Sequence, residues 1–563
     1  MIASQVATLA VRLSTEGLGE EARAAATAAL EACQPRDGTA CGGDAVVDAA
    51  IRDAAFGADA GSADPLTRAL RYAADAPCDA RWQWRVVAAA LAGQPGGDRA
   101  AEAALIGAEV AHRLAMALDG PVSSAWDAPG RVGVIGAAVA AGLAGGADAG
   151  QLASAVAISA SLTSGHQVHA GTPLGRLHPG FAAAAGVLAA SLGRRGVTGS
   201  PTAVEGPRGL FHAYGERDAA AGLLDGFGTT WHVLDSRPAT AAWERPAEPA
   251  DRDGEDDLTD QLAHFASALR LDDLPEPVRH AGRRTLANVV GLAVDAAGHP
   301  AVELVAATLR DLDLYGTTAV LGRAEPVSPY AAALLMGYAM HVEDFDDTHL
   351  RTVLHPGAPA VAAALAAAQV AAAPGVDVLA GVVAGVEVGS RHPVIDAAIA
   401  VRAAGLVAAD IERVVATVRP VVLEVMGVAE PRDGLQSKFS VYHCFAVGLL
   451  DGGAGPAQYS DARATDAAVV DLRRKVEVLT DPQMPKDACR VEVVDRKGVR
   501  HLFVVEHATG SVAAPMTDAQ LADKFRLLAG PVLGERAEDL WRAVMALDEA
   551  ERIADLFALA VRP

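Results

Sequence analysis

The chain has 563 residues, of which 51% are hydrophobic and only 4% aromatic, and its formal net charge at pH 7 is −23. This length allows several domains, and the abundance of alanine and glycine predicts closely packed helices rather than an extensive sheet. The negative charge argues against nucleic acid or an anionic membrane as a partner. We therefore expect a mainly helical protein that binds neither.

The five cysteines are scattered and form no CxxC pair. This usage fits a reducing cytoplasm and predicts neither a disulfide framework nor a zinc site. The first residues, "MIASQVATLAVRLSTEG", lack a basic segment followed by a long apolar one, so no secretion signal is expected. No nucleotide-binding glycine loop is found either, and we expect no cofactor.

The first part of the chain, residues 1–236, is predicted to be a helical unit that recurs later. "QVATLAVRLSTEGLGEEARAA" from Gln5 matches "QLAHFASALRLDDLPEPVRHA" from Gln261 without a gap. Such internal similarity indicates two related structural units. Residues 237–257, rich in proline and charge, are predicted to be a linker or fusion seam. The second copy, residues 258–391, is shorter and lacks half a helical domain.

A loop in the first copy, "SGHQVHAGTPLGRLHPG", places three histidines and one arginine between two predicted helices. A glycine-rich turn of this kind could receive an anionic group at a helix N-terminus. The alternative is a well-packed loop without a ligand. The residues concerned are His166, His169, Arg176 and His178.

The second copy contains "HVEDFDDTHLRTVLHPG", which has three histidines and four carboxylates among seventeen residues. On a helix, His341, Asp344 and Thr348 would share one face and could converge on one pocket. His355 follows in a Pro-Gly turn, where an imidazole that titrates near neutrality could act as a base. The corresponding stretch of the first copy, from Tyr72, has no such cluster.

Two other interpretations of this cluster stay open. The acids could form a solvated helix turn, although the apolar run before them argues against it. Clustered histidine and aspartate are also good ligands for a divalent cation.

The run from residue 356 to 386 is weakly charged and is broken by Pro374 and Gly375. Two buried helices explain it better than a membrane span. From residue 392 to 520, alternating β-branched runs such as "IERVVATV", "KVEVLTD" and "CRVEVVDRKGVRHLFVVEHA" predict strands of a small α+β domain. The tail, residues 521–563, is predicted to return to helix.

Five segments carry a resemblance: "HVEDFDDTH…HPG", "RLHPGFAAAAGVLAA…GVTGSP", "HPVIDAAIAV", "KFSVYHCFAVGLLDG" and "LADKFRLLAG". Together they resemble the MmgE/PrpD family, which includes 2-methylcitrate dehydratase and cis-aconitate decarboxylase. The resemblance implies a large helical domain and a smaller α+β lid around a metal-free pocket. It also implies dimerisation through helical domains, so we expect the two copies to form an intrachain pseudo-dimer, with further homo-oligomerisation possible.

The resemblance also implies roles for particular positions. Catalytic positions are expected at Asp344, Thr348, His355 and His443, the last aligned with a tyrosine of the family. Further residues of the acidic cluster, of the histidine loop and of the "KFSVYHCF" motif are expected, from their residue types, to bind substrate: His341, Asp347, His166, His169, Arg176, His178, Lys438 and Tyr442. Spacing does not decide which of Tyr442 and His443 faces the core. Two lysines of the family pattern are missing here, at Gly175 and Arg237.

These features predict a lyase in which a basic side chain assists the loss of a leaving group from the substrate. The fused, rearranged copies resemble more narrowly the enzymes that form the aziridine of azabicyclic natural products such as azinomycin, in which an amine displaces sulfate within one molecule. The missing lysines favour this over a dehydratase or decarboxylase of a small polycarboxylate, which is the alternative. A non-catalytic binding or scaffold protein is the third possibility.

Overall fold

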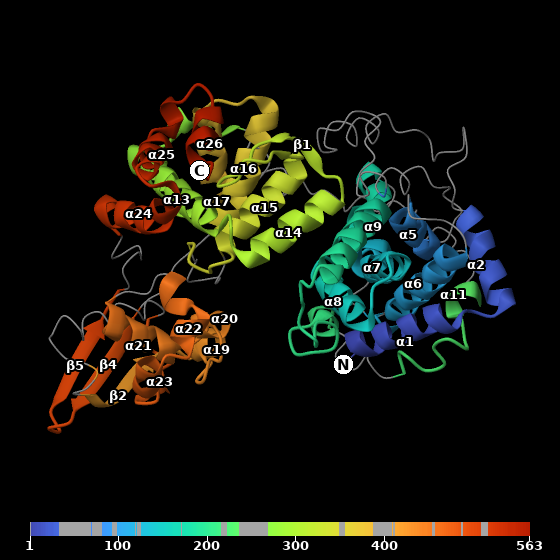
Figure 1. Ribbon diagram of the computed structural model, residues 1–563, viewed down its shortest axis with the longest axis horizontal. Coiled ribbons are helices and arrows are strands. Elements are labelled where there is room, and N and C mark those ends of the chain that lie inside the picture. Colours follow the sequence, from blue (N-terminus) through green and yellow to red (C-terminus); the bar gives the residue numbers. More distant parts are fainter. Residues whose placement is uncertain are drawn as a thin grey trace, which may run out of the picture. The chain divides into compact units, whose positions relative to one another are not determined.

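The computed structural model (Figure 1) describes residues 2–32, 69, 82–92, 98–118, 120, 125–169, 172–215, 222–235, 268–347, 355–386, 408, 411–452, 456–485, 488–507 and 516–562. Two compact units can be separated. Unit 1 comprises residues 1–256, 303–317 and 327–331, and unit 2 comprises residues 257–302, 318–326 and 332–563. Each unit is considered by itself.

Unit 1 is a bundle of helices around α7. Its main helices are α1 (Ile2–Glu16), α2 (Glu20–Ala32), α5 (Trp82–Leu91), α6 (Asp98–Ala117), α7 (Val134–Ala144), α8 (Ala149–Ala160) and α9 (Pro173–Arg194), with two short ones, α10 (Leu210–Ala213) and α11 (His232–Asp235). Every residue of α7 from Val134 to Leu143 is buried. α6 and α7 approach so closely that a Cβ on Gly107 would lie 2.5 Å from the Gly136 carbonyl oxygen. The small side chains predicted from composition therefore allow this tight packing.

Two helices cross the boundary that separates the units. α14 (Pro300–Asp311) begins in unit 2 and continues in unit 1, and α15 (Pro329–His341) begins in unit 1 and continues in unit 2. β1 (Tyr315–Thr318) lies between them and is bridged to Val327.

The helical part of unit 2 contains the end of α15 together with α13 (Glu276–Ala296), α16 (Gly357–Ala371) and α17 (Gly375–Val386). The C-terminal helices α24 (Asp518–Leu533), α25 (Arg536–Met545) and α26 (Ala554–Ala560) return to it, and α24 packs along α13. The sequence repeat has a local counterpart, because α2 and α13 begin at the aligned residues Glu20 and Glu276.

The lid part of unit 2 contains a four-stranded sheet in the order β3-β2-β4-β5. β2 (Ile411–Val418) is parallel to β3 (Val476–Thr480) and antiparallel to β4 (Cys489–Asp495), which pairs with the edge strand β5 (Arg500–Val505). Short helices accompany the sheet: α19 (Pro420–Met426), α20 (Gly434–Lys438), α21 (Val441–Asp451), α22 (Asp461–Ala464) and α23 (Ala467–Arg473). Residues of α21 and α23 share a buried apolar core with the inward side chains of the strands.

The predicted fold class, a mainly helical protein with a small α+β lid, is confirmed. The four strands of the lid fall on the three predicted runs, with β4 and β5 both on the last one, and β1 lies outside them. Pro374 separates α16 from α17 as expected. Among the helices that the structure describes, none is by itself long and apolar enough to cross a membrane. Only α13 and α14 taken together, bent by 82°, meet that criterion.

Candidate active site

Residues 341–347, which we call the acid turn, do not continue the helix that precedes them. α15 ends at His341, and Asp344 has a φ angle of 51°. The Asp344 amide donates to the His341 carbonyl over 2.7 Å, which closes a tight turn. The prediction that His341 and Asp344 share a helical face is therefore wrong, because a left-handed residue interrupts the helix. Thr348 lies outside the described residues.

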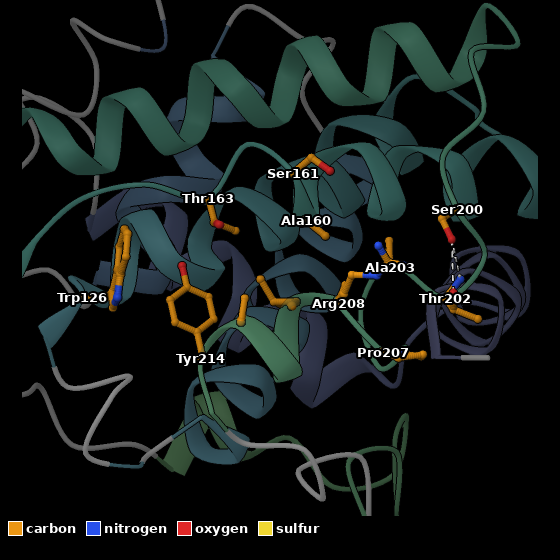
Figure 2. A pocket seen from close by; sticks show the side chains of 13 residues that line it. Trp126, Ala160, Ser161, Thr163, Ser200, Thr202, Ala203, Pro207, Arg208 and Tyr214 are labelled. Atoms are coloured by element: carbon orange, nitrogen blue, oxygen red, sulfur yellow. Dashed lines mark hydrogen bonds between the residues drawn. The ribbon is translucent and has the colours of Figure 1, made fainter. Parts of the chain in front are cut away.

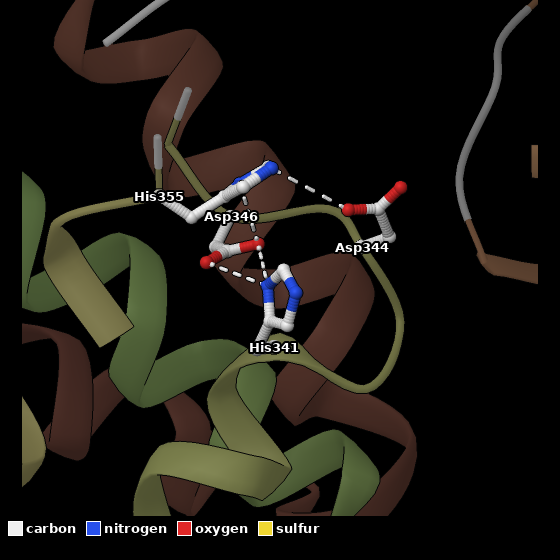
Figure 3. A group of neighbouring side chains, drawn as sticks. All are labelled: His341, Asp344, Asp346 and His355. Carbon is white, nitrogen blue, oxygen red and sulfur yellow. Dashed lines mark hydrogen bonds and ion pairs between the residues drawn. The ribbon is translucent and has the colours of Figure 1, made fainter. Parts of the chain in front are cut away.

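The acid turn nevertheless brings His341 and His355 to the same carboxylate (Figure 3). His341 Nδ1 lies 3.0 Å from Asp346 Oδ1, and His355 Nδ1 lies 3.2 Å from the same oxygen. The two imidazole centroids are 4.8 Å apart. The Asp346 side chain is fully buried, whereas 47% of the His341 side chain and 25% of the His355 side chain are exposed. We call His341, Asp344, Asp346 and His355 the His–Asp cluster.

Asp346 determines the protonation of the two imidazoles. A carboxylate only accepts hydrogen bonds, so each Nδ1 donates, and each Nε2 is directed away from Asp346. The hydrogen bond to Asp346 raises the pKa of both His341 and His355 above the ordinary value. Burial alone would raise the pKa of Asp346, but the bonds from the two imidazoles bring it below its ordinary value. The site therefore favours an ionised carboxylate beside protonatable imidazoles.

Asp344 extends the cluster on its outer side. Its Oδ1 lies 3.6 Å from His355 Nε2, and both side chains are only about a quarter exposed. An imidazole nitrogen and a carboxylate oxygen thus lie together where a substrate proton could be received.

Asp347 joins the acid turn to the start of α16. Its Oδ2 accepts a hydrogen bond of 3.1 Å from the Gly357 amide. A Cβ at Gly357 would lie 2.1 Å from Asp347 Oδ1, so the carboxylate occupies the space that only glycine leaves. Burial and the neighbouring Asp346 raise the pKa of Asp347.

Glu343 connects the acid turn to the lid and to the segment between α13 and α14, and its charge acts on Asp295 of α13. Lys438, at the end of α20, donates to Glu343 Oε2 over 2.8 Å and to the Val342 carbonyl over 3.3 Å. His299 Nε2 lies 3.7 Å from Glu343 Oε1. Burial, followed by the charge of Glu343, raises the pKa of Asp295 on α13 to about 6.

A second lysine reaches the acid turn from α24. Lys524 donates to the Phe345 carbonyl over 2.7 Å, and its ammonium lies 3.9 Å from the centroid of the Phe345 ring. Burial lowers the pKa of Lys524 to about 8, although the charges of Asp346 and Asp347 oppose this shift. The residue is therefore still mostly a cation at neutral pH.

Within the described part of the chain, the His–Asp cluster is also the group best placed to hold a cation. One potential ligand atom from each of its four residues lies within 4.8 Å of the others. Imidazole nitrogen and carboxylate oxygen are ligands of zinc and other divalent transition metals. The same atoms also satisfy one another through hydrogen bonds, which suits acid–base chemistry.

The histidine loop of the first copy lies in unit 1, between α8 and α9. The His166 ring packs against Trp126 at a tilt of 52° with centroids 4.6 Å apart, and the centroid of the His169 ring lies 6.0 Å from that of the buried His178 ring. His178 Nδ1 approaches Asp127 Oδ2 at 3.2 Å. Arg176 lies in the first turns of α9, and the structure does not describe its side chain.

A cavity of about 440 Å³ lies in unit 1, beside the histidine loop (Figure 2). Trp126 forms one side of it, and Arg208, whose φ is 72°, lines another part. Five of the residues that line it carry hydroxyl groups: Ser161, Thr163, Ser200, Thr202 and Tyr214. No carboxylate is found among the described residues that line it, although the chain is strongly acidic.

His443 and Tyr442 both lie in the lid, at the start of α21, but their side chains lie in different surroundings. His443 is completely buried, and its Nε2 donates to the Gln458 carbonyl over 2.8 Å. Burial lowers the pKa of His443, so this imidazole stays neutral. Tyr442 is half-buried and packs against the apolar core of the lid. His443 is thus the one of the pair that faces the interior.

Two residues at the site were not singled out from sequence. Asp346 is one of three similar aspartates, and only its burial between two imidazoles distinguishes it. Lys524 belongs to "LADKFRLLAG", a motif that carried the resemblance without suggesting a role for the lysine.

Comparison with known proteins gives matches along most of the chain. The model of the MmgE/PrpD N-terminal domain matches residues 85–221 and 260–403, and that of the MmgE/PrpD C-terminal domain matches residues 389–549.

Among curated proteins, a cis-aconitate decarboxylase of Aspergillus terreus is 26% identical over 149 residues, which is 26% of this chain and 30% of that protein. The cis-aconitate decarboxylase-like protein oryM of Aspergillus oryzae is 27% identical over 144 residues, 24% of this chain and 30% of that protein. The matched region therefore spans less than a third of these relatives.

Proposed function

The chain belongs to the MmgE/PrpD family, and on that premise we propose that it is a lyase that takes a proton from a small substrate and expels a leaving group. The His–Asp cluster supplies the acid–base groups. The observation that carries the proposal is the shared contact of both imidazoles with the buried Asp346, which orients each Nε2 for proton transfer.

We further propose that the leaving group is sulfate and that the attacking group is an amine of the same molecule. Asp344 receives the ammonium group, and His355 Nε2 takes its proton. The freed nitrogen lone pair forms the new C–N bond as the C–O bond breaks, and sulfate leaves with the bonding electrons. The product is an aziridine, a reaction that depends on fixing the attack geometry.

The charges around the acid turn support an amine-bearing substrate. Four carboxylates lie within residues 343–347. The two lysines that reach this turn already bind it, one through Glu343 and a carbonyl and the other through a carbonyl. A tricarboxylate would meet mostly negative charge here, whereas an ammonium group would be attracted.

A second candidate function is dehydration or decarboxylation of a small polycarboxylate. It is supported by the relatives described as cis-aconitate decarboxylases. It requires cationic partners for several carboxylates of the substrate.

The two functions can be separated with purified full-length protein. It is incubated in parallel with a vicinal amino sulfate ester, cis-aconitate and 2-methylcitrate, and products are followed by released sulfate and by mass spectrometry. Sulfate release with loss of the corresponding mass supports aziridine formation. Turnover of a polycarboxylate alone would establish the second function, and no turnover of any substrate would favour a non-catalytic protein.

The His355→Ala variant tests whether the cluster performs the reaction. His280→Ala is a suitable control, because His280 also lies near a carboxylate, Asp518, but at the surface. We expect loss of turnover only in the first variant. Equal activity of the two would exclude His355 as the base.

A further inference from the structure

The acid turn has an unusual backbone at its centre. Asp344 is one of four non-glycine residues with positive φ in the described part of the chain. This conformation costs free energy unless the surrounding structure holds it. Within the turn, the Asp344 amide bonds to the His341 carbonyl and the His341 side chain bonds to Asp346. Contacts from outside the turn add to this support.

Two lysines provide contacts on both sides of Asp344. Lys438 donates to the carbonyl of Val342, two residues before it, and Lys524 donates to the carbonyl of Phe345, one residue after it. Each lysine makes a second contact in the same turn, Lys438 with Glu343 and Lys524 with the Phe345 ring.

The two lysines are themselves held by folded elements. Lys438 ends α20, whose N-terminus is capped by Asp433, and its side chain is only 9% exposed. Lys524 precedes the buried Phe525, which packs where α24 meets Gly291 of α13. A charged donor on a fixed element can hold a carbonyl in one orientation.

We propose that Lys438 and Lys524 are positioning residues that together clamp the acid turn in the shape that presents Asp344. The roles of these lysines are thus to order the site rather than to bind substrate. The clamp itself is a structural property, and only its effect on turnover rests on the proposed function.

The charges fit this arrangement. The lysines face the carboxylates of Glu343, Asp346 and Asp347, and each cation lowers the repulsion among acids that lie close together. Holding the carbonyls of Val342 and Phe345 orients one peptide plane on each side of Asp344, which restricts the backbone between them.

The test uses Lys438→Met and Lys524→Met, singly and together, in the full chain. Methionine keeps much of the side-chain length and removes the charge and the donors. Lys475→Met is the matched control, since Lys475 lies in the turn between α23 and β3 and pairs with the exposed Asp471 of the lid. Lys524→Arg and Lys438→Arg restore charge and donors.

The first readout is hydrogen–deuterium exchange of the peptide that spans residues 341–347, without substrate. We expect about tenfold faster exchange there in either Met variant, because opening of the turn becomes easier, and unchanged exchange in β2. The Arg variants should recover most of the protection. Unchanged exchange in the acid turn of both Met variants would overturn the clamp.

The second readout separates kcat from KM with the substrate found to turn over. A misplaced catalytic group lowers kcat by about 10- to 100-fold, with KM changed by less than about twofold. A large rise in KM at constant kcat would instead make the lysines substrate-binding residues and overturn the proposal. If no substrate is turned over, the proposed function fails, while the exchange experiment still decides the clamp.

Discussion

The substitution Asp346→Asn tests the centre of the candidate site. The side chain keeps its size but loses its charge, and its amide now presents two donors beside one acceptor. The amide oxygen can still accept from both Nδ1–H groups, because both imidazoles contact the same oxygen of Asp346, but each hydrogen bond is weaker without the negative charge. Both imidazoles become weaker bases, because the charge that raises their pKa values is gone.

The size of the effect follows from the two hydrogen bonds that are lost or weakened. A hydrogen bond to a charged group contributes about 1.5–3 kcal/mol when it is well shielded. Because the His341 side chain is 47% exposed and that of His355 is 25% exposed, water screens part of this contribution. We expect a destabilisation of about 2–3 kcal/mol in total. Turnover should fall by about 10²- to 10⁴-fold.

The destabilisation should also depend on pH in a defined window. Both imidazole pKa values are raised, so their contribution to stability is fully present below the ordinary value of 6.5 and is lost as the pH rises through the folded values. The pKa of Asp346 is lowered, so its contribution is present above the ordinary 3.8 and is lost as the pH falls through the folded value. The effect of Asp346→Asn should therefore be largest between roughly pH 4 and 6.5.

Urea denaturation at several pH values measures the stability, and NMR titration of the imidazole protons, assigned with His341→Ala and His355→Ala, measures the pKa values. In the Asp346→Asn variant, the pKa of at least one of the two histidines should fall to its ordinary value or below. Asp518→Asn is the control, because Asp518 pairs with His280 at the surface, and its loss should cost less than about 1 kcal/mol. If both histidines kept raised pKa values and turnover were unchanged, the role assigned to Asp346 would be wrong.

Three further predictions concern the same site. Asp344→Asn should lower turnover by about 10²-fold or more without unfolding the chain. Asp313→Asn, at another aspartate with φ of 51°, should leave turnover unchanged. Equal activities of the two variants in the steady-state assay would place the base elsewhere. Gly357→Ala should destabilise the chain by about 1–2 kcal/mol in thermal unfolding, because a Cβ there meets a buried carboxylate. The control Gly381→Ala, with open space around it, should stabilise α17 by about 0.5–1 kcal/mol. A stabilised Gly357→Ala variant would contradict the packing described. A chelator should leave turnover unchanged, since the proposed reaction uses only side-chain acids and bases, and activity that is lost and then restored by one divalent cation would make the His–Asp cluster a metal site.

The sequence alone determined the fold class and the positions of most elements. The alternating runs in the lid correspond to β2, β3, β4 and β5, and the break at Pro374 corresponds to the end of α16. These features depend on local periodicity and on residues such as proline that restrict the backbone wherever they occur. The sequence also indicated that histidines and acids near residue 350 would gather, since they are close together along the chain.

The tertiary structure decided how the acid turn is shaped and which of its acids is central. The apolar run of α15 gives no sign that the helix stops at His341, and the three aspartates after it look alike in sequence. The contacts that distinguish them come from residues that are distant in the chain: Lys438 and Lys524 hold carbonyls 96 and 179 positions earlier. Burial and pKa depend on what surrounds a group in three dimensions, so neighbouring residues of one chemical type acquire different roles only when the chain has folded.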